Sequence, residues 1–563
     1  MKLTVIFLEL PLLDNDADGH GEHLRLAGVY LRSVLERSAE RRYFKACFLP
    51  EHAYALDDRR LVQRLEKLRP DVVACTLYLW NIERSLRVLN ETRRRLPRVR
   101  IVVGGPEVAR DHPFLFRSRI PDVAVAGEGE TVFPAILHGL RTGRRMLAQS
   151  VAWKTSRGYR WGTRAIPVRT LSQSLPAPAC SYYRPDVRGM AYLEASRGCP
   201  RHCVYCRYHH LRQGVSFLKP EAIARRVAAL LRKGAQEIRL MDPAFNAHPA
   251  FEEVLRRLAA INVSGSLRFF AEVNADVLTR EQARLLARAN FTEIEIGVQS
   301  RNPRVLRRIG RPTDLQALDR GIGRLLAEGI RVTVDLMVGL PGQALRDVRE
   351  SSAWAARLKG VRVQCLQTLL LPGTDLRACR KRWRLAASGR PPYAVTASAA
   401  LPARDMRRAL AIVRRRIGRL TDCPTRALIG RSLPDLFPER IHLIVPGNKD
   451  FRGIQSRRAL IFHSADLYAY RKDILSILRM AVREEPHALW QFVLAPEWEE
   501  PLDLIDTLVD ALRQYTPHLN DRWIALDAGG RRAARRVMVW LGRRRYDASW
   551  VATADALLRK AFY

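Results

Sequence analysis

The amino-acid sequence predicts an α/β protein built from several domains. Its 563 residues exceed what a single hydrophobic core organises, and a hydrophobic content of 47% is ordinary for a globular chain. Short apolar runs rich in β-branched residues alternate with amphipathic stretches of helical period in two series, one over residues 1–142 and one from Ala191 onward. This alternation indicates parallel sheets that are covered by helices.

The first series predicts a domain over residues 1–142 with a doubly wound, Rossmann-like sheet and helices on both of its faces. Sheets of this kind bind ligands at the carboxyl ends of their strands. The expected strands are residues 3–10, 44–49, 71–79, 99–103 and 122–126, and the expected helices are residues 23–37, 59–68, 82–96 and 131–140.

The segments that follow these strands have unusual compositions. A long polar loop, residues 14–21, follows the first strand, and the aromatic residues Tyr78 and Trp80 follow the third. A Gly-Gly-Pro-Glu turn at residues 104–107 follows the fourth strand, and a Gly-Glu-Gly-Glu turn at residues 127–130 follows the fifth. Glycines let the backbone approach a flat ligand or a phosphate closely, although each turn taken alone is also ordinary turn chemistry.

The second series predicts an open, partial (β/α) barrel over residues 189–384, after a linker at residues 143–188 that is marked by turn residues and prolines. Counted from Ala191 it has six strand–helix units, which is fewer than the eight of a closed barrel. The strands expected after the first are residues 237–242, 267–274, 293–299, 331–340 and 361–370.

Three cysteines, Cys199, Cys203 and Cys206, directly follow the first strand of this second series. Three thiolates in one loop favour a soft metal or an iron–sulfur cluster. With only three ligands, one iron of a four-iron cluster stays open as a coordination site for a substrate. The alternative is structural zinc, whose fourth ligand would come from a nearby histidine: His202, His209 or His210.

The cysteine spacing, with Tyr205 before the last cysteine, resembles the radical S-adenosylmethionine (SAM) superfamily. The preceding sheet, with its two glycine turns and its aromatic strand end, is similar to the cobalamin-binding domain of class B members. The resemblance implies a [4Fe-4S] cluster on the three cysteines, SAM at the open iron, and cobalamin at the strand ends. The residues that it places at the cobalamin are Tyr78, Trp80, Gly104, Gly105, Glu107, Gly127 and Glu128.

The resemblance also gives roles to polar residues at the strand ends of the barrel. Tyr205 would line the adenine of SAM, and Glu272 and Gln299 would meet its polar parts, with Ser300 next to them. A helix-capping role is the alternative for Ser300. No residue is predicted to be catalytic.

The first domain departs from the family pattern at one point. Many cobalamin domains supply an axial histidine from an Asp-x-His-x-x-Gly motif, which this sequence lacks, and His20 and His52 stand in other contexts. Either cobalt is bound without a histidine from that motif, or the domain has kept its fold and lost the cofactor.

The pattern breaks in the C-terminal region, residues 385–563, after a boundary at the prolines of residues 391–392. Helical stretches at residues 403–420, 473–485 and 503–515, mixed with apolar runs, predict a mainly helical or α+β domain of unknown role. Such a domain could lie over the open side of the barrel and select the substrate. Its tryptophans, Trp490, Trp498 and Trp523, are interpreted as core residues rather than as a pocket lining.

The formal charge of +39 comes mostly from arginines that recur on helix after helix, often near glutamates. This pattern is typical of a solvated surface and does not favour a nucleic-acid partner, although the cluster between Arg531 and Arg545 could meet an acidic one. The apolar runs are too short to cross a bilayer, and nine cysteines without paired spacing fit a reducing compartment. We therefore expect a cytoplasmic protein with no membrane partner.

The resemblance implies an enzyme that acts with cobalamin and SAM, and it favours a methyltransferase that modifies an unactivated carbon of a small molecule or peptide. Such an enzyme needs an electron donor to reduce its cluster. Two alternatives stay open: a radical rearrangement or cyclisation without methyl transfer, and a non-catalytic iron–sulfur protein that binds nucleic acid.

Overall fold

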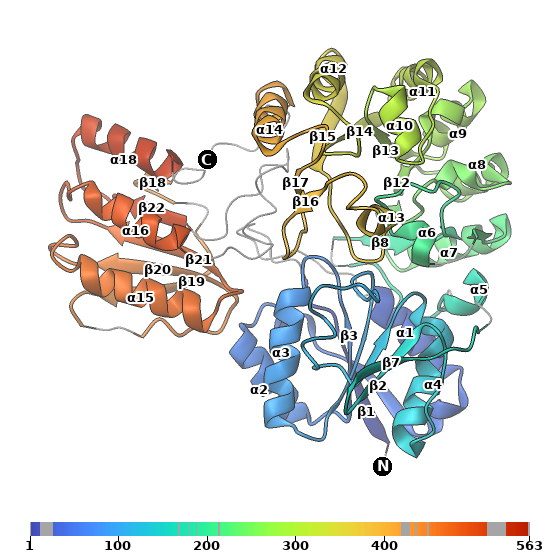
Figure 1. Cartoon of the computed structure of the whole chain (residues 1–563), viewed down its shortest axis with the longest axis horizontal. Helices are drawn as coiled ribbons and strands as arrows, with labels where there is room; N and C mark the ends of the chain where they lie inside the picture. Colours follow the sequence, from blue (N-terminus) through green and yellow to red (C-terminus); the bar gives the residue numbers. More distant parts are fainter. Residues whose placement is uncertain are drawn as a thin grey trace.

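Three helix-flanked sheets follow one another along the chain in the structure, a computed structural model (Figure 1). The first lies below the second in this view, and the third stands to their left. The structure describes residues 2–11, 26–166, 169–177, 179–186, 188–211, 214–417, 428–433, 436–447, 450–514 and 536–560. The polar loop predicted at residues 14–21 lies outside these residues.

The first sheet has the order β2-β1-β3-β4-β5-β6-β7, and its first five strands are parallel. This order is that of a doubly wound sheet, which confirms the predicted class. The strands are β1 (Leu3–Leu8), β2 (Phe44–Phe48), β3 (Val72–Thr76), β4 (Arg100–Gly104), β5 (Val123–Val125), β6 (Val151–Thr155) and β7 (Gly158–Trp161). The helices are α1 (Leu26–Glu36), η1 (Ala39–Arg42), η2 (Glu51–Tyr54), α2 (Asp58–Leu68), α3 (Ile82–Arg95) and α4 (Gly129–Thr142).

Helices cover both faces of this sheet because successive residues of a strand point to opposite sides. In β1, Ile6 and Leu8 pack in the core that α2 and α3 share, whereas Val5 and Phe7 pack in the core with Leu35 of α1 and Phe133 of α4. All four β1 residues are buried. Burial on two sides explains why the strand reads as a continuous apolar run.

The interpretation of residues 143–188 as a linker needs correction. Strands β6 and β7 form a hairpin that extends the first sheet antiparallel to β5. The polar turn at residues 155–158 is the hairpin turn, with Gly158 at a φ of 130°, where glycine is favoured. Val151 and Trp153 are buried against the sheet, so an amphipathic hairpin was mistaken for a connection. The short helix α5 (Leu171–Ser174) follows.

The second sheet is an open barrel of six parallel strands in the order β15-β14-β13-β12-β11-β8, as predicted. Its first and last strands, β8 and β15, do not pair with each other. The strands are β8 (Met190–Leu193), β11 (Glu237–Leu240), β12 (Arg268–Glu272), β13 (Phe291–Gln299), β14 (Arg331–Val338) and β15 (Val361–Gln367). A short hairpin, β9 (Ser196–Arg197) and β10 (Ser216–Phe217), lies beside the cysteine loop.

The helices that pack on the outer face of the barrel and bury a common core with its strands are α7 (Pro220–Arg232), α8 (Phe251–Ile261), α9 (Arg280–Arg288), α11 (Leu315–Ala327) and α12 (Leu345–Ala355). Shorter elements follow the carboxyl ends of the strands: α6 (Tyr208–Leu211), η3 (Phe245–Ala247), η4 (Ala275–Val277), α10 (Pro303–Arg308) and α13 (Asp375–Ala378).

The segment after residue 385 belongs to the body of the barrel, which differs from the predicted boundary. The strands β16 (Ala386–Ala387) and β17 (Val395–Ala397) and the helix α14 (Ala403–Ile417) follow α13. Met406 and Val413 of α14 are buried in the same core as the barrel strands. The amphipathic face of α14 therefore covers the barrel beside α12 and β15.

The remaining C-terminal residues form a separate α/β layer, and the prediction of a mainly helical or α+β domain is wrong. Five parallel strands have the order β18-β22-β21-β20-β19. Strands β20 and β21 are buried on both faces, which erases the alternating pattern by which a strand is recognised in a sequence. The elements are β18 (Ile429–Gly430), β19 (Glu439–Ile444), β20 (Arg457–His463), α15 (Arg471–Glu484), β21 (Leu489–Ala495), α16 (Asp503–Arg513), β22 (Arg536–Trp540) and α18 (Ala548–Lys560).

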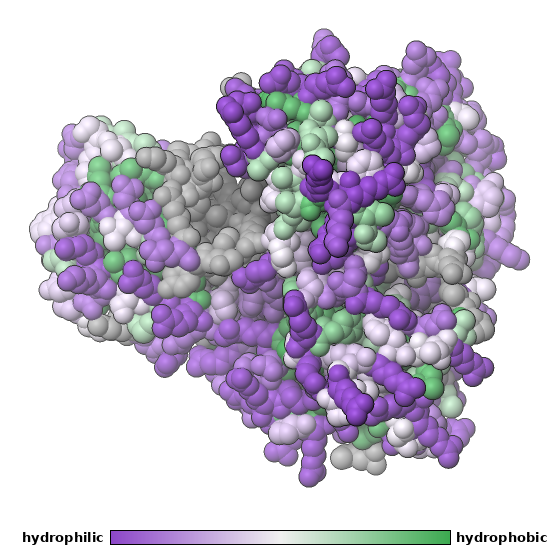
Figure 2. Space-filling model, in the orientation of Figure 1, coloured by the Kyte–Doolittle hydropathy of each residue, from purple (hydrophilic) through white to green (hydrophobic). Residues whose placement is uncertain are grey.

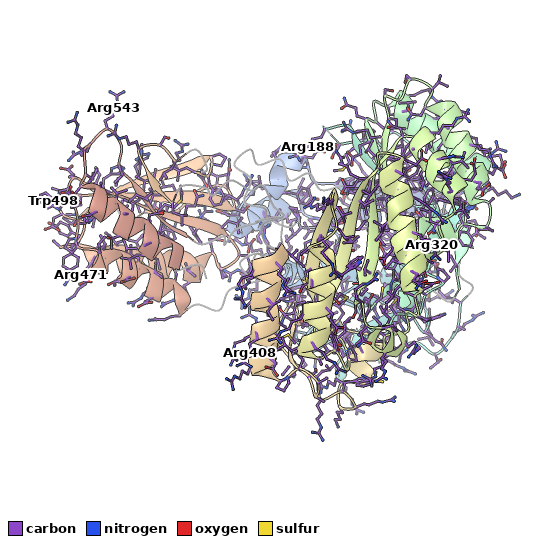
Figure 3. The ribbon with its side chains drawn as sticks, turned by 90° about the horizontal axis from the view of Figure 1, so that it is seen from above. Arg188, Arg320, Arg408, Arg471, Trp498 and Arg543 are labelled. Carbon is purple, nitrogen blue, oxygen red and sulfur yellow. The ribbon has the colours of Figure 1, made fainter. Side chains whose placement is uncertain are left out.

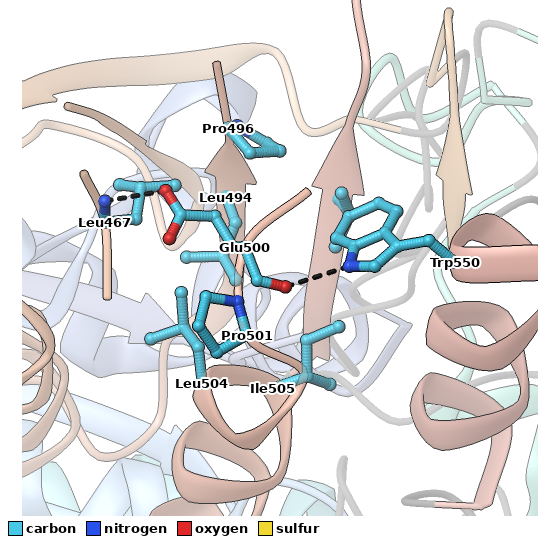
Figure 4. A pocket seen from close by; sticks show the side chains of 9 residues that line it. Leu467, Leu494, Pro496, Glu500, Pro501, Leu504, Ile505 and Trp550 are labelled. Atoms are coloured by element: carbon cyan, nitrogen blue, oxygen red, sulfur yellow. Dashed lines mark hydrogen bonds between the residues drawn. The ribbon is translucent and has the colours of Figure 1, made fainter. Parts of the chain in front are cut away.

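The cavity found among the described residues of this third layer is small. Trp490 is fully buried in its core, whereas Trp498 is 49% exposed at the outer edge (Figure 3), and Trp523 lies outside the described residues. The hollow beneath Trp550 and Glu500 has about 10 Å³ of free space (Figure 4), which is no more than one water needs. The layer docks on the first domain, where Arg458 pairs with buried Asp57 and the Asp57 amide donates to the Ile454 carbonyl at 2.8 Å.

Basic side chains are spread over the whole molecule. Hydrophilic residues cover most of the face shown in Figure 2, over all three layers. The labelled arginines in Figure 3, which include Arg188, Arg320 and Arg543, lie far apart on different layers. Part of the predicted C-terminal cluster, including Arg531, lies outside the described residues. Within the described part of the chain, no helix is both long and apolar enough to span a membrane.

Candidate active site

The cysteine loop lies at the carboxyl end of β8, where the barrel opens. Gly198, at a φ of 96°, begins the loop, and a Cβ there would come within 2.3 Å of the Gly214 carbonyl oxygen. Further along, the Val204 amide donates to the Ile309 carbonyl at 3.0 Å, and the Val204 carbonyl accepts from the Leu376 amide at 2.8 Å. The loop is therefore held between the segments that follow α10 and β15.

The three thiols of this loop fit a cluster better than a single ion. Cys203 is buried, and Cys199 and Cys206 are half-buried. Their sulfur atoms do not form a set within 4.8 Å of one another, whereas ligands of one zinc ion lie closer together. Burial raises the pKa of Cys199 and raises that of Cys206 to about 11, so these thiols stay protonated until a metal binds.

Arg311 is a site residue that the sequence did not reveal, because it stands in a loop without a motif. Its side chain donates to the Gly297 carbonyl at 2.7 and 3.0 Å, and its Nη1 lies 3.8 Å from the sulfur of Cys203. The half-buried guanidinium joins the cysteine loop to the end of β13.

Three carboxylates face the interior of the barrel on neighbouring strands. Glu272 of β12 pairs in register with Glu295 of β13. On β14 the residue in register with Glu295 is Thr333, and Asp335 follows two residues later. Burial and the Glu295 carboxylate raise the pKa of Glu272 to about 7. The same two causes raise the pKa of Asp335, whose Oδ1 is buried without a hydrogen bond. The interior can therefore hold protons or face a cation. Asp335 stands at a strand end that the resemblance assigned to SAM binding, whereas Glu295 was not predicted as a site residue.

Asp242 and Asn274 organise the mouth of the barrel. Asp242 is buried and accepts hydrogen bonds from the Ala195 amide at 3.0 Å and from the Ser196 hydroxyl. Burial raises its pKa to about 7 despite these two donors. Asn274 accepts from Nε of Arg201 at 3.0 Å, which fixes the second residue after Cys199. Both residues thus position the cysteine loop from neighbouring strand ends.

The structure separates the predicted SAM-binding residues into two groups. Gln299 has a φ of 64° at an irregularity of the β13–β14 register, and its Oε1 is buried without a partner. Glu272 likewise faces the open interior. Ser300, by contrast, is fully buried and its hydroxyl accepts from the Asn302 amide at 3.2 Å ahead of α10, which is a local structural use. Tyr205 packs against the apolar cluster around Val305, and burial raises its pKa.

Tyr78 and Trp80 form a flat aromatic surface at the end of β3. Their rings are stacked with centroids 4.5 Å apart and an interplanar angle of 5°, and the indole nitrogen of Trp80 is buried without a partner. Asn81, which is buried, holds this turn: its Oδ1 accepts from the Tyr78 amide at 2.8 Å and its Nδ2 donates to the Leu10 carbonyl at 2.9 Å. Asn81 was not predicted to have a role here.

The glycine turn after β4 has a structural reason within the protein. Gly105 has a φ of 102°, and a Cβ there would lie 2.5 Å from the Leu77 carbonyl oxygen, whereas Gly104 makes only ordinary contacts. Glycine at residue 105 lets the loops after β3 and β4 pack together. The close packing of these two loops therefore explains the glycine at residue 105 even when no cofactor is bound.

Glu107 joins the first domain to the barrel. Its Oε2 accepts from the Tyr393 hydroxyl at 2.9 Å and lies 3.2 Å from Nε2 of His112, and all three residues are buried. The other ring nitrogen of His112 accepts from the Leu115 amide at 3.0 Å, so both nitrogens are engaged. The carboxylate that was predicted at the cobalamin is the centre of a buried contact between domains.

Arg197 joins the strand ends of the two sheets from the barrel side. Its guanidinium lies 3.1 Å from Glu130 and 3.8 Å from Glu128 of the first domain, and 2.5 Å from Glu194 at the end of β8. Burial raises the pKa of Glu194 even though Arg197 opposes this shift. The carboxyl ends of the first sheet and the mouth of the barrel therefore face each other across this cation. Gly127, which precedes Glu128, has a φ of 88°.

The fold and site define a class of protein: a ligand-binding doubly wound domain facing an open barrel that carries three cysteines at its mouth. Two family models match these parts of the chain. The B12 binding domain matches residues 30–137, and the radical SAM superfamily matches residues 193–355. The chain therefore combines the two domains of the cobalamin-binding, class B radical SAM family, as the resemblance in the sequence implied.

Two curated relatives are similar over half of this chain. One is the 2-(S-pantetheinyl)-carbapenam-3-carboxylate methyltransferase of Streptantibioticus cattleyicolor, 26% identical over 306 residues. Another is the cobalamin-dependent radical SAM methyltransferase TokK of Streptomyces tokunonensis, 24% identical over 310 residues. The matched part covers 50% of this chain and only 44% of each relative.

Solved structures support the fold. The radical SAM methyltransferase TsrM from Kitasatospora setae, with cobalamin and a [4Fe-4S] cluster bound, has a TM-score of 0.55 and 18% identity over 68% of this chain and 79% of that one. The cobalamin-dependent radical enzyme OxsB, with aqua-cobalamin bound, has a TM-score of 0.52 and 19% identity over 64% of this chain and 53% of that one. At these identities the likeness concerns the architecture.

Proposed function

We propose that this chain is a cobalamin-dependent radical SAM methyltransferase that modifies an unactivated carbon of a small molecule or peptide. One observation carries the proposal: the cysteine loop and the strand ends of the B12-binding domain face each other across Arg197. Two cofactors bound at these places would border one cavity, as the hydrogen abstraction and methyl transfer of such an enzyme require.

The residues present fit an iron–sulfur cluster with one open iron. Cys199, Cys203 and Cys206 are the soft ligands, and Arg311 places a positive charge beside Cys203. Asp242 and Asn274 hold the backbone and the side chains of the loop around them. SAM would be bound between this loop and the end of β13, where Gln299 offers an amide oxygen without a partner.

The residues at the strand ends of the first domain fit a corrin. The stacked surface of Tyr78 and Trp80 offers a flat apolar face and an indole N–H without a partner. When bound, the cluster and SAM supply the radical that removes a hydrogen atom from the substrate, and cobalamin supplies the methyl group. The protein positions these groups and keeps water from the cavity.

The interior carboxylates give the cavity its own chemistry. Glu272 exchanges a proton near neutral pH, since its pKa is about 7, and so holds or accepts one beside the substrate. Burial and the Glu295 carboxylate raise the pKa of Asp335, which favours its neutral form, a hydrogen-bond donor. The substrate entering here meets acceptors and donors on β12, β13 and β14, opposite the cysteine loop.

Anaerobic reconstitution tests the proposal. The protein is loaded with iron, sulfide and cobalamin and incubated with SAM and a reductant that takes the place of the cellular electron donor. We expect 5′-deoxyadenosine, S-adenosylhomocysteine and a corrin absorbance that remains after gel filtration. Cys203→Ser should abolish the cluster absorbance and both products, whereas Cys379→Ser, at an exposed cysteine outside the loop, should change neither.

The outcomes separate the alternatives. 5′-Deoxyadenosine without S-adenosylhomocysteine, with plausible substrates present, points to a radical rearrangement or cyclisation. Absence of both products from fully loaded protein overturns the proposed reaction. A corrin that washes off at once means that the first domain has kept its fold and lost its cofactor.

A further inference from the structure

Two histidines and a carboxylate meet beside the cysteine loop. His209 and His210 belong to the one-turn helix α6, which begins two residues after Cys206, and Asp375 is the first residue of α13. Among the described residues of the chain, this is the one set of three metal-binding side chains whose ligand atoms all lie within 4.8 Å of one another. None of the three is used by the proposed reaction. We propose that they form a second metal site, which binds a divalent ion of the zinc type.

The spacing of the ligand atoms is that of a coordination sphere. Nε2 of His209 lies 3.5 Å from Oδ2 of Asp375, and Nε2 of His210 lies 3.4 Å from its Oδ1. A tetrahedral zinc ion with bonds of about 2.0 to 2.1 Å keeps its ligand atoms roughly 3.3 to 3.4 Å apart. A direct hydrogen bond between imidazole and carboxylate would be shorter, at about 2.7 to 3.2 Å.

His209 lacks the partners that a buried imidazole normally has. Its side chain is only 9% exposed, and both of its ring nitrogens are buried without a hydrogen bond. Nearly all buried polar groups in proteins are paired, so an orphaned imidazole aimed at a carboxylate needs a partner. An ion bound to Nε2 provides one.

The donor set distinguishes this site from the cysteines. Two imidazoles and one carboxylate suit zinc and its first-row neighbours, whereas three thiolates suit an iron–sulfur cluster. The Asp375 side chain is 52% exposed, so water can complete the coordination from the open side. The ring of His202, with its centroid 5.4 Å from that of His209, is a second source of a fourth ligand.

Such an ion would fasten the end of the cysteine loop. The backbone of α13 already holds this loop, because the Leu376 amide donates to the Val204 carbonyl at 2.8 Å. The side chain of Thr374 caps α13 and fixes the position of Asp375. A metal bridge from Asp375 to α6 would fix the other end of the loop, next to Cys206. The inference does not depend on the proposed reaction.

Metal analysis with zinc as the probe tests the site. The full chain is purified, treated with a chelator, reloaded with one equivalent of zinc and then reconstituted with iron and sulfide under anaerobic conditions. Zinc-edge X-ray absorption should show nitrogen and oxygen ligands at about 2.0 to 2.1 Å and no sulfur at about 2.3 Å. His209→Ala and Asp375→Asn should each lower the zinc affinity at least about 10-fold and leave the iron content unchanged.

Controls keep the proposal falsifiable. Cys203→Ser should lose iron and keep zinc. His463→Ala should keep both metals, because among the described residues the His442–His463 pair of the third layer is not part of a set of three metal-binding side chains. If His209→Ala fails to fold, His210→Asn tests the same site at a side chain that is 26% exposed. Zinc–sulfur ligation, or no zinc retained by wild-type protein, would overturn the inference.

Discussion

Removal of the Tyr393 hydroxyl should loosen the contact between the B12-binding domain and the barrel. The hydroxyl donates to Glu107 at 2.9 Å, and both groups are buried. Burial raises the pKa of Tyr393, so it remains a donor at every working pH. A hydrogen bond to a charged group contributes about 1.5 to 3 kcal/mol, so Tyr393→Phe should weaken the contact by about 2 kcal/mol.

Hydrogen exchange is the suitable assay, because the chain has several domains and a single unfolding free energy is not defined for it. A loss of about 2 kcal/mol lowers the protection of amides in residues 105–112 and 390–395 roughly 30-fold. Glu107→Gln should have a similar effect, and the double variant should lose clearly less than the sum, because both changes break one bond.

Tyr159→Phe is the matched control. Its hydroxyl donates to the neutral carbonyl of Pro121 at 2.6 Å, within the first domain. We expect a loss of about 1 kcal/mol there, without an effect at residues 390–395. Additive effects of Glu107→Gln and Tyr393→Phe would refute the argument. A Glu107→Gln variant that releases corrin while its amide protection is unchanged would also refute the argument, because that result would indicate that Glu107 contacts the cofactor.

Three further changes probe the site. Asp242 has a pKa of about 7 in the folded chain and an ordinary value of 3.8, so the folded state binds the extra proton. The stability of the barrel mouth should therefore fall as pH rises from about 4 to 7, by about 4 kcal/mol in total. Asp242→Asn should remove this part of the pH dependence, and a pH profile of amide protection around residues 195–196 that is the same in the variant would contradict the argument. Arg197→Met removes the cation that Glu128, Glu130 and Glu194 share, and it should destabilise the domain contact by about 3 kcal/mol or more in the same exchange assay. The control is Arg94→Met, at an exposed pair with Glu91, which should change stability by less than about 1 kcal/mol. Trp80→Ala should reduce corrin retention at least about 10-fold, because aromatic packing against the corrin is lost. The control is Trp161→Ala, on strand β7, which should retain the corrin absorbance. Equal losses of corrin in both variants would rule out a specific role for Trp80.

The sequence alone determined the order of the first two domains and the place of the cysteine loop after the first barrel strand. Strands such as β1 are buried on both faces and so stand out as apolar runs between amphipathic helices. Cys199, Cys203 and Cys206 lie within eight residues, so their spacing is local and readable. The same local reasoning misjudged the β6–β7 hairpin and the C-terminal layer, where short or doubly buried strands give no clear period.

Only the tertiary structure decided which distant residues share the site. Arg311, Glu295 and Asp335 lie on separate elements and meet because the barrel brings its strand ends together. Glu107 reads as a turn residue of the first domain, but its partner Tyr393 stands 286 positions later. His209, His210 and Asp375 likewise become one cluster only when α6 and α13 pack beside the cysteine loop. Such contacts depend on packing between elements, and spacing along the chain carries no record of them.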